Sequence, residues 1–124
     1  MKNYLLLFLY LLLSFNSLAQ NSDRVFKSAS IQNEGILNIE VIDGRYRIQF
    51  YNSKIVETSF IPKGEDFKKN SHAVVLKSNF LGTELNESSS FVNFSSKGIK
   101  VKVQKAPFKI SYFYNEKEVT SEKT

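Results

Sequence analysis

The chain has 124 residues, which is enough for one domain and too few for two. It contains no cysteine, which excludes disulfides, thiolate nucleophiles and sulfur ligands for a metal. Its 17 basic and 12 acidic residues give a net charge of +5, a mild excess that favours solubility over a nucleic-acid footprint.

Residues 1–19 are predicted to be a secretory signal peptide with a helical apolar segment. Lys2 supplies a positive start, and Tyr4–Leu13 form an uninterrupted apolar run. Small residues stand at Ala19 and two positions before it, so cleavage is expected after Ala19. A membrane-spanning helix needs about 20 apolar residues, and polar residues interrupt this run first. We therefore expect residues 20–124 to be a periplasmic or secreted domain with no membrane attachment after cleavage.

The first half of the mature region predicts four short strands. Arg24–Ile31 is the first, and Ile36–Ile42 and Arg45–Tyr51 form a hairpin around Asp43-Gly44. Asp-Gly readily takes the positive φ angles of a type I′ turn, so that turn is expected here. Lys54–Ile61 is the fourth strand, and the following proline, Pro62, blocks further ladder bonding. In the third strand one face carries Tyr46, Ile48 and Phe50 and the other carries Arg45, Arg47 and Gln49.

The second half continues the pattern with weaker boundaries. Ala73–Phe80 predicts a strand, Leu81-Gly82 a turn, and Ser90–Ser95 a strand after the polar stretch Asn86–Ser89. Beyond it, apolar and polar residues alternate twice, with the apolar sets Ile99, Val101, Val103 and Phe108, Ile110, Tyr112, Tyr114. No helical periodicity occurs outside the signal peptide. About eight strands predict an all-β fold, an antiparallel sandwich or a barrel.

No catalytic residue, cofactor-binding residue or metal ligand is predicted. His72 is the only histidine, which excludes a multi-histidine metal site, and no nucleophile-elbow motif accompanies it. Glu116 with Glu118, and Glu65 with Asp66, are carboxylate pairs of the kind glycoside hydrolysis needs. Neither pair has the apolar surroundings that would make one acid a proton donor, so both are interpreted as solvated charges.

Lysines and aromatic residues give two further candidate patterns. A basic run could follow a phosphate backbone, but its alternation is typical of the solvent-exposed face of a strand. Nucleic-acid binding is therefore not expected. The run consists of Lys97, Lys100, Lys102, Lys105 and Lys109. Aromatic residues could stack on sugars if exposed, but their alternation favours core packing. They are Tyr46, Phe50, Phe60, Phe91, Phe94, Phe108, Tyr112 and Tyr114. Sequons begin at Asn86 and Asn93 and matter only in a glycosylating host.

Four stretches, in this order, resemble the start of glycoside hydrolase family 31 enzymes, which include α-glucosidases and oligosaccharide α-glucosyltransferases. They are Val25–Ser28, the hairpin at Asp43-Gly44, Lys54–Pro62 and Lys105–Tyr112. The resemblance spans nearly all of the mature chain. Near its end the chain departs from the pattern, because Asn115-Glu116-Lys117 stands where a glycine-containing turn is common.

The resemblance implies a galactose-mutarotase-like β-sandwich that precedes a catalytic (β/α)8 barrel. The catalytic aspartates of the family lie in the barrel, so none is carried over to this chain. The polar loop Lys63–His72 is one candidate for a loop that reaches the rim of the sugar pocket. The expected function is that of a non-catalytic sandwich of an enzyme acting on α-glucans, supporting the barrel or binding α-glucan weakly. The alternatives are a free-standing carbohydrate-binding module and a protein that pairs a sheet edge with a partner strand.

Overall fold

The computed structural model describes residues 24–32, 35–68 and 80–122, which contain nine β-strands and no helix. The predicted signal peptide and His72 therefore lie outside the described residues. The strands are β1 (Phe26–Gln32), β2 (Ile36–Val41), β3 (Gly44–Asn52), β4 (Ile55–Pro62), β5 (Glu84–Glu87), β6 (Phe91–Ser95), β7 (Ile99–Gln104), β8 (Lys109–Tyr114) and β9 (Lys117–Ser121).

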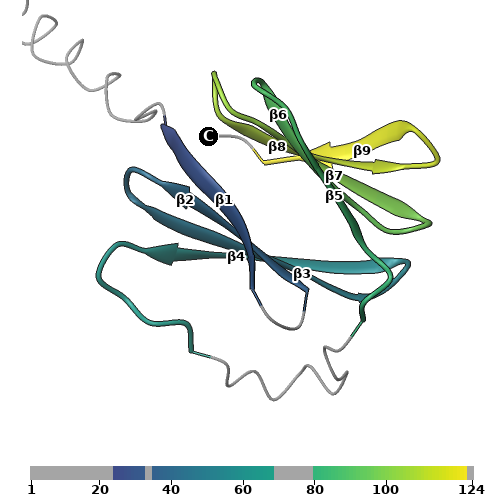
Figure 1. The fold of residues 1–124 in the computed structure, drawn as a ribbon, viewed down its shortest axis with the longest axis horizontal. Helices are drawn as coiled ribbons and strands as arrows, with labels where there is room; N and C mark the ends of the chain where they lie inside the picture. The colour runs from purple at the N-terminus through teal and green to yellow at the C-terminus, as the bar shows by residue number, and fades with distance from the viewer. Residues whose placement is uncertain (1–23, 33–34, 69–79, 123–124) are drawn as a thin grey trace, which may run out of the picture.

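Two antiparallel meanders pack face to face. The first sheet has the order β1-β2-β3-β4, and the second has the order β5-β6-β7-β8-β9. Figure 1 shows them as two layers, with the strands of the first half below those of the second. Within each sheet, strands that are consecutive in sequence pair with one another, which is what short turns between alternating segments produce. The prediction of an all-β antiparallel sandwich is confirmed.

The core lies between the two sheets and comes from alternate residues of their central strands. Tyr46, Ile48 and Phe50 of β3 are buried, as the alternation predicts. Phe50 meets Phe94 of the second sheet edge to face, with ring centroids 5.1 Å apart. The buried cluster is Leu37, Ile39, Val41, Tyr46, Ile48, Phe50, Val92, Phe94, Val101, Val103, Phe108 and Ile110.

The outer face of the first sheet is also partly covered, although its sequence is polar. Gln49 is 2% exposed and Asn38 is 6% exposed. The segment that follows β4 returns over this face, where the Arg47 guanidinium lies 4.5 Å from the centroid of the Phe67 ring. Arg47 also donates a hydrogen bond to Gln49 Oε1, and its guanidinium approaches Glu57. Alternation identified the two faces correctly but could not show that the polar one is covered.

The turn at Asp43-Gly44 is not of type I′. Val41 pairs with Gly44, so the two loop residues are Ile42 and Asp43, and neither has a positive φ. Gly44 is needed for packing instead, because a Cβ there would lie 2.3 Å from the Ile61 carbonyl oxygen. The hairpin is confirmed and its predicted turn type is wrong.

The type I′ geometry occurs at the β8–β9 hairpin. Tyr114 pairs with Lys117, and the loop residues Asn115 and Glu116 have φ angles of 47° and 63°. A chain without glycine at this turn therefore still closes the hairpin. Asparagine tolerates the left-handed region, whereas glutamate adopts it at a conformational cost.

Several boundaries differ from the prediction. Glu84–Glu87 is strand β5, although its second half was assigned to a polar stretch before the next strand. Lys117–Ser121 is strand β9, which the sequence did not predict as a separate strand. The predicted strand Ala73–Phe80 lies outside the described residues except for Phe80, which is in a loop. Both missed strands carry mostly polar, exposed residues, so they show no apolar alternation.

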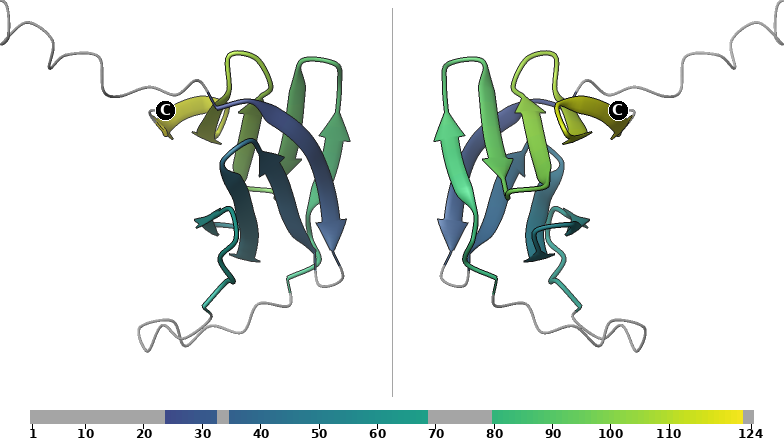
Figure 2. Two further views of the ribbon diagram at one scale, coloured as in Figure 1. Left: turned by 90° about the vertical axis from the view of Figure 1, so that its left-hand side faces the viewer. Right: turned by 90° about the vertical axis from the view of Figure 1, so that its right-hand side faces the viewer.

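Hydrogen bonds secure both ends of the sandwich, and the one at the first end joins the two sheets, whereas those at the second end lie within the first sheet. At one end Ser96 Oγ donates to the Ser53 carbonyl oxygen over 2.8 Å, joining the β6–β7 turn to the β3–β4 turn. At the other end the start of β1 lies beside the end of β9 (Figure 2). There Arg24 donates to the Tyr46 hydroxyl and to Asp43 Oδ2.

Candidate functional sites

An apolar cleft opens along one side of the sandwich. The second sheet has one strand more than the first, and its last strands flank the cleft opposite β4. The cleft has a volume of about 530 Å³. Its lining residues are Val56, Thr58, Ile99, Tyr112, Phe113, Tyr114, Val119, Thr120 and Glu122. We call this surface the β4–β9 cleft.

Polar groups converge on one part of the β4–β9 cleft. The Tyr112 hydroxyl lies 2.7 Å from Thr58 Oγ1 and 3.3 Å from Glu122 Oε1, so it joins the two sheets. Burial, together with the nearby Glu122 carboxylate, raises the pKa of Tyr112 to about 12. The hydroxyl therefore stays protonated at physiological pH and acts as a hydrogen-bond donor.

Glu122 also influences Tyr46, which lies deeper in the sandwich. Burial raises the pKa of Tyr46, the Glu122 carboxylate raises it further, and the Arg24 guanidinium opposes both effects. Tyr112, Glu122 and Tyr46 thus form a polar cluster with Arg24 beside it, of which Tyr112 and Glu122 line the cleft. Because these groups interact with one another, the cluster has the features of a structural contact.

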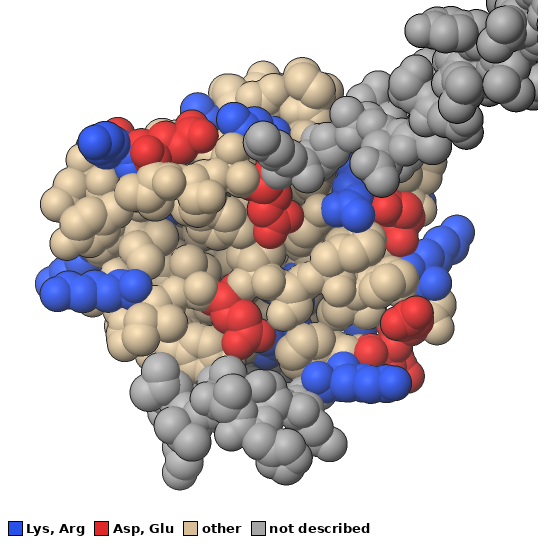
Figure 3. All heavy atoms as spheres, turned by 180° about the vertical axis from the view of Figure 1, so that it is seen from behind, with Lys and Arg blue, Asp and Glu red and all other residues tan. Residues whose placement is uncertain are grey.

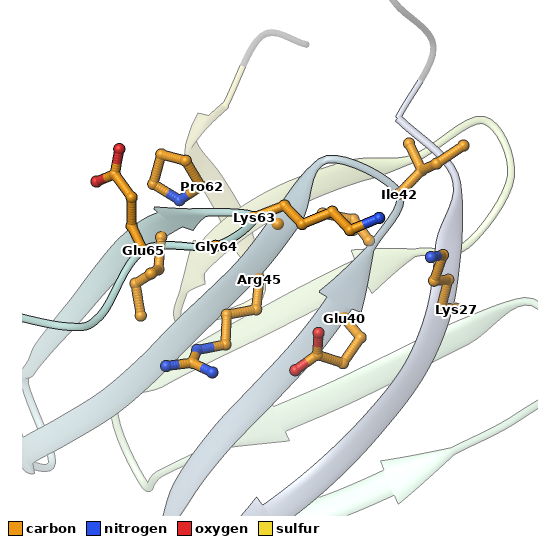
Figure 4. A pocket seen from close by; sticks show the side chains of 11 residues that line it. Lys27, Glu40, Ile42, Arg45, Pro62, Lys63, Gly64 and Glu65 are labelled. Carbon is orange, nitrogen blue, oxygen red and sulfur yellow. The ribbon is translucent and has the colours of Figure 1, made fainter.

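A second, charged pocket lies on the outer side of the first sheet, next to the β2–β3 hairpin (Figure 4). Arg45 from β3 and Glu40 from β2 project to the same side of the sheet, and Lys63 reaches across from the segment after β4. Lys27 of β1 and Glu65 complete the charged lining. The pocket has a volume of about 170 Å³. We call it the hairpin pocket.

The carboxylate pairs singled out in the sequence do not form acid–base pairs. Glu116 makes an ion pair with Lys100 at 2.7 Å, and Glu118 makes one with Lys109 at 3.6 Å. Glu65 and Asp66 are exposed in the segment after β4. Of the polar loop Lys63–His72, only Lys63–Lys68 is described, and its first three residues line the hairpin pocket.

The predicted basic run is largely neutralised. Besides the two pairs above, Lys105 binds Glu87 at 2.7 Å, and Lys102 lies 4.0 Å from the centroid of the Phe91 ring. Only Lys97 of the run has no such partner among the described residues. The face in Figure 3 shows positive and negative side chains interspersed, with no broad area of one sign. This arrangement is that of a solvated surface.

Most of the aromatic residues serve the core. Tyr46, Phe50, Phe94 and Phe108 are buried, and Phe60 and Tyr112 pack against them. Phe91 is half-buried beneath Lys102. Tyr114 is 45% exposed and lies in the β4–β9 cleft. The default of core packing is therefore right for six of these eight residues.

Within the described ranges, no three of the metal-ligating side chains of His, Cys, Asp and Glu gather in one place. The same ranges contain no helix able to cross a membrane.

No protein-family model matches the chain, and no curated protein is similar to it in sequence. The resemblance to glycoside hydrolase family 31 therefore rests on the stretches Val25–Ser28, Asp43-Gly44, Lys54–Pro62 and Lys105–Tyr112.

Sequence reasoning missed both surfaces. The β4–β9 cleft combines residues from four strands, and β9 was not predicted, so no pattern along the chain brings Val119 near Val56. The hairpin pocket combines Lys27, Arg45 and Lys63, which are spaced 18 residues apart. The sequence signal nearest to it is the polar loop after Pro62, whose residues Lys63, Gly64 and Glu65 line this pocket.

Proposed function

We propose that this chain is a non-catalytic β-sandwich module that docks a partner polypeptide along the β4–β9 cleft. The observation that carries the proposal is the cleft itself: an apolar surface between two edge strands, β4 and β9. Exposed edge strands and contiguous apolar patches are the usual features of protein interaction sites.

The chemistry of the cleft favours an extended segment as its occupant. Among the described strands, none lies beside the outer edge of β4, so its backbone groups can pair with an added strand. Alternate side chains of such a strand would meet Val56 and Val119, which line opposite walls. The Glu122 carboxylate gives the cleft one negative charge, so a lysine or arginine in the segment would complement it.

The family resemblance supplies a candidate for the partner. In glycoside hydrolase family 31 the N-terminal sandwich packs on a catalytic (β/α)8 barrel that acts on α-glucans. We extend the proposal to that class: the module is exported, its partner is such a barrel, and the module contributes support and no chemistry. Glu116 and Glu118 are each ion-paired with a lysine, which supports a role without chemistry.

The docking proposal is tested by co-elution. The purified chain is mixed with a family 31 barrel that lacks its own sandwich, and the mass of the eluting species is measured by light scattering. A complex is expected, and Val119→Glu should abolish it because the new charge would enter the apolar cleft. Leu81→Glu is the matched control, because Leu81 is 75% exposed and lies outside the cleft.

Two results separate the parts of the proposal. Absence of a complex would contradict the barrel as partner. If the Val119→Glu variant formed the complex as well as the parent chain does, the cleft would not be the docking surface. The chain alone should release no product from maltose, maltooligosaccharides or a chromogenic α-glucoside. Turnover that survives repurification would contradict the non-catalytic role.

A further inference from the structure

The hairpin pocket gathers three cations that come from different parts of the first sheet. Lys27 belongs to β1, Arg45 belongs to β3, and Lys63 follows β4. None of them makes an ion pair with another described residue. Outside the pocket, five described cations have an acidic partner within 4.0 Å and several others have none, so what distinguishes the three pocket cations is that they line one pocket.

Arg45 is placed opposite an acid that does not neutralise it. Glu40 is its direct cross-strand partner, and opposite charges at such positions normally attract. The two side chains nevertheless form no ion pair, and both contribute to the lining of the pocket. Figure 4 shows them on the same side of the sheet, with Lys63 extended over the neighbouring hairpin. The pocket thus presents a fork of donors and a carboxylate acceptor on either side of an open space.

We infer that the hairpin pocket binds an acidic sugar through its carboxylate. Arginine donates two parallel hydrogen bonds to a carboxylate, and Lys63 and Lys27 add point charges around it. Glu40 can accept hydrogen bonds from the hydroxyls of the same ligand. A hexuronate, which has one carboxylate and several neighbouring hydroxyls, matches this combination of groups.

The charge balance selects among related ligands. Three cations and the two carboxylates of Glu40 and Glu65 give the lining a net charge of +1, which matches a single carboxylate. A phosphate dianion would meet the repulsion of Glu40, and a neutral sugar would leave Arg45 without its anion. This site is separate from the β4–β9 cleft, and its ligand class differs from the neutral α-glucans that the family resemblance implies.

The test is a titration of the ¹⁵N-labelled chain with glucuronate, glucose, acetate and phosphate, followed by amide chemical shifts. Glucuronate should produce saturable shifts confined to residues 41–45 and 61–65. Arg45→Gln should weaken glucuronate binding at least about tenfold, because it removes charge-assisted hydrogen bonds. Lys63→Gln should also weaken it, whereas Lys97→Gln should not, since Lys97 lies in the β6–β7 turn outside the pocket.

Several results would overturn the inference. Equal affinity for acetate or phosphate would mean that the pocket attracts anions in general, and equal affinity for glucose would mean that the carboxylate is not recognised. Shifts scattered over the lysine-rich strands would place the interaction elsewhere. A dispersed amide spectrum is required of each variant as evidence that it is folded, so that a loss of binding reports the removed side chain.

Discussion

Gly98 lies where two turns from opposite sheets meet. A Cβ at this position would be 2.6 Å from the carbonyl oxygen of Ser53, and that oxygen also accepts the Ser96 hydrogen bond. Backbone on both sides leaves little freedom to relax. The φ of Gly98 is not in the left-handed region, so the close contact alone makes a larger residue unfavourable.

Gly98→Ala should therefore destabilise the protein by about 1–3 kcal/mol, the usual cost of overpacking. Chemical denaturation measures the free energy of unfolding. Lys97→Ala is the control in the same turn, because Lys97 is exposed, and its free energy of unfolding should change by about 0.5 kcal/mol or less. Equal effects of the two substitutions would contradict the contact.

Tyr112 makes stability depend on alkaline pH. Its pKa in the folded protein is about 12 and its ordinary value is 10.0, so the unfolded chain loses the proton first as pH rises. The contribution of Tyr112 to stability is fully present below pH 10.0 and is lost as pH rises through about 12.

Tyr112→Phe should lower the free energy of unfolding by about 1 kcal/mol at neutral pH, because Thr58 loses a hydrogen-bond partner. Between pH 10.0 and about 12 the variant should lose less stability than the parent. Tyr46 and Tyr51 also have raised pKa values, so part of the pH dependence will remain. Identical dependence on pH in the two proteins would contradict this role.

At the scale of elements, the turn of the β8–β9 hairpin contains a residue whose type is unfavourable for its backbone conformation. Glu116 has a φ of 63°, a region that side chains other than Gly, Asn and Asp avoid. Its ion pair with Lys100 offsets little of that cost, because the Glu116 side chain is 80% exposed.

Glu116→Gly should stabilise the protein by about 1 kcal/mol by removing the left-handed strain. Glu116→Gln keeps the strain and removes the charge, so its free energy of unfolding should stay close to that of the parent. Thermal or chemical unfolding of both variants distinguishes the effects. A gain of equal size with glutamine would attribute the effect to charge and would contradict the backbone explanation.

The elements that could be predicted are those with an apolar face. The strands with Tyr46, Ile48 and Phe50, and with Val101 and Val103, alternate because one face enters the core. Strands β5 and β9 were missed because they lie at the edges of the second sheet, where most residues remain exposed. The turn type was mistaken because Asp-Gly favours type I′ locally, whereas pairing of Gly44 with Val41 moves the turn one residue earlier.

The candidate sites were less predictable than the strands for a physical reason. The β4–β9 cleft depends on which edges of the two sheets adjoin, and alternation within a strand contains no information about that. In the sequence, Lys27, Arg45 and Lys63 are indistinguishable from ordinary surface lysines and arginines. Only the folded sheet brings them to one pocket.

At the scale of the whole molecule, the two surfaces divide the proposed roles. The β4–β9 cleft is apolar and lies between the sheets, so it suits a polypeptide segment. The hairpin pocket is small and charged and lies outside the first sheet, so it suits a polar ligand. Docking along the cleft would leave the hairpin pocket accessible, because the two surfaces have no lining residue in common.

The most direct test of the docking role is hydrogen–deuterium exchange of the chain alone and with the family 31 barrel. The account predicts slower exchange in β4 and β9 when the barrel is present, because added backbone pairing protects the edge amides. Unchanged exchange in both strands, or protection confined to another part of the sandwich, would contradict it.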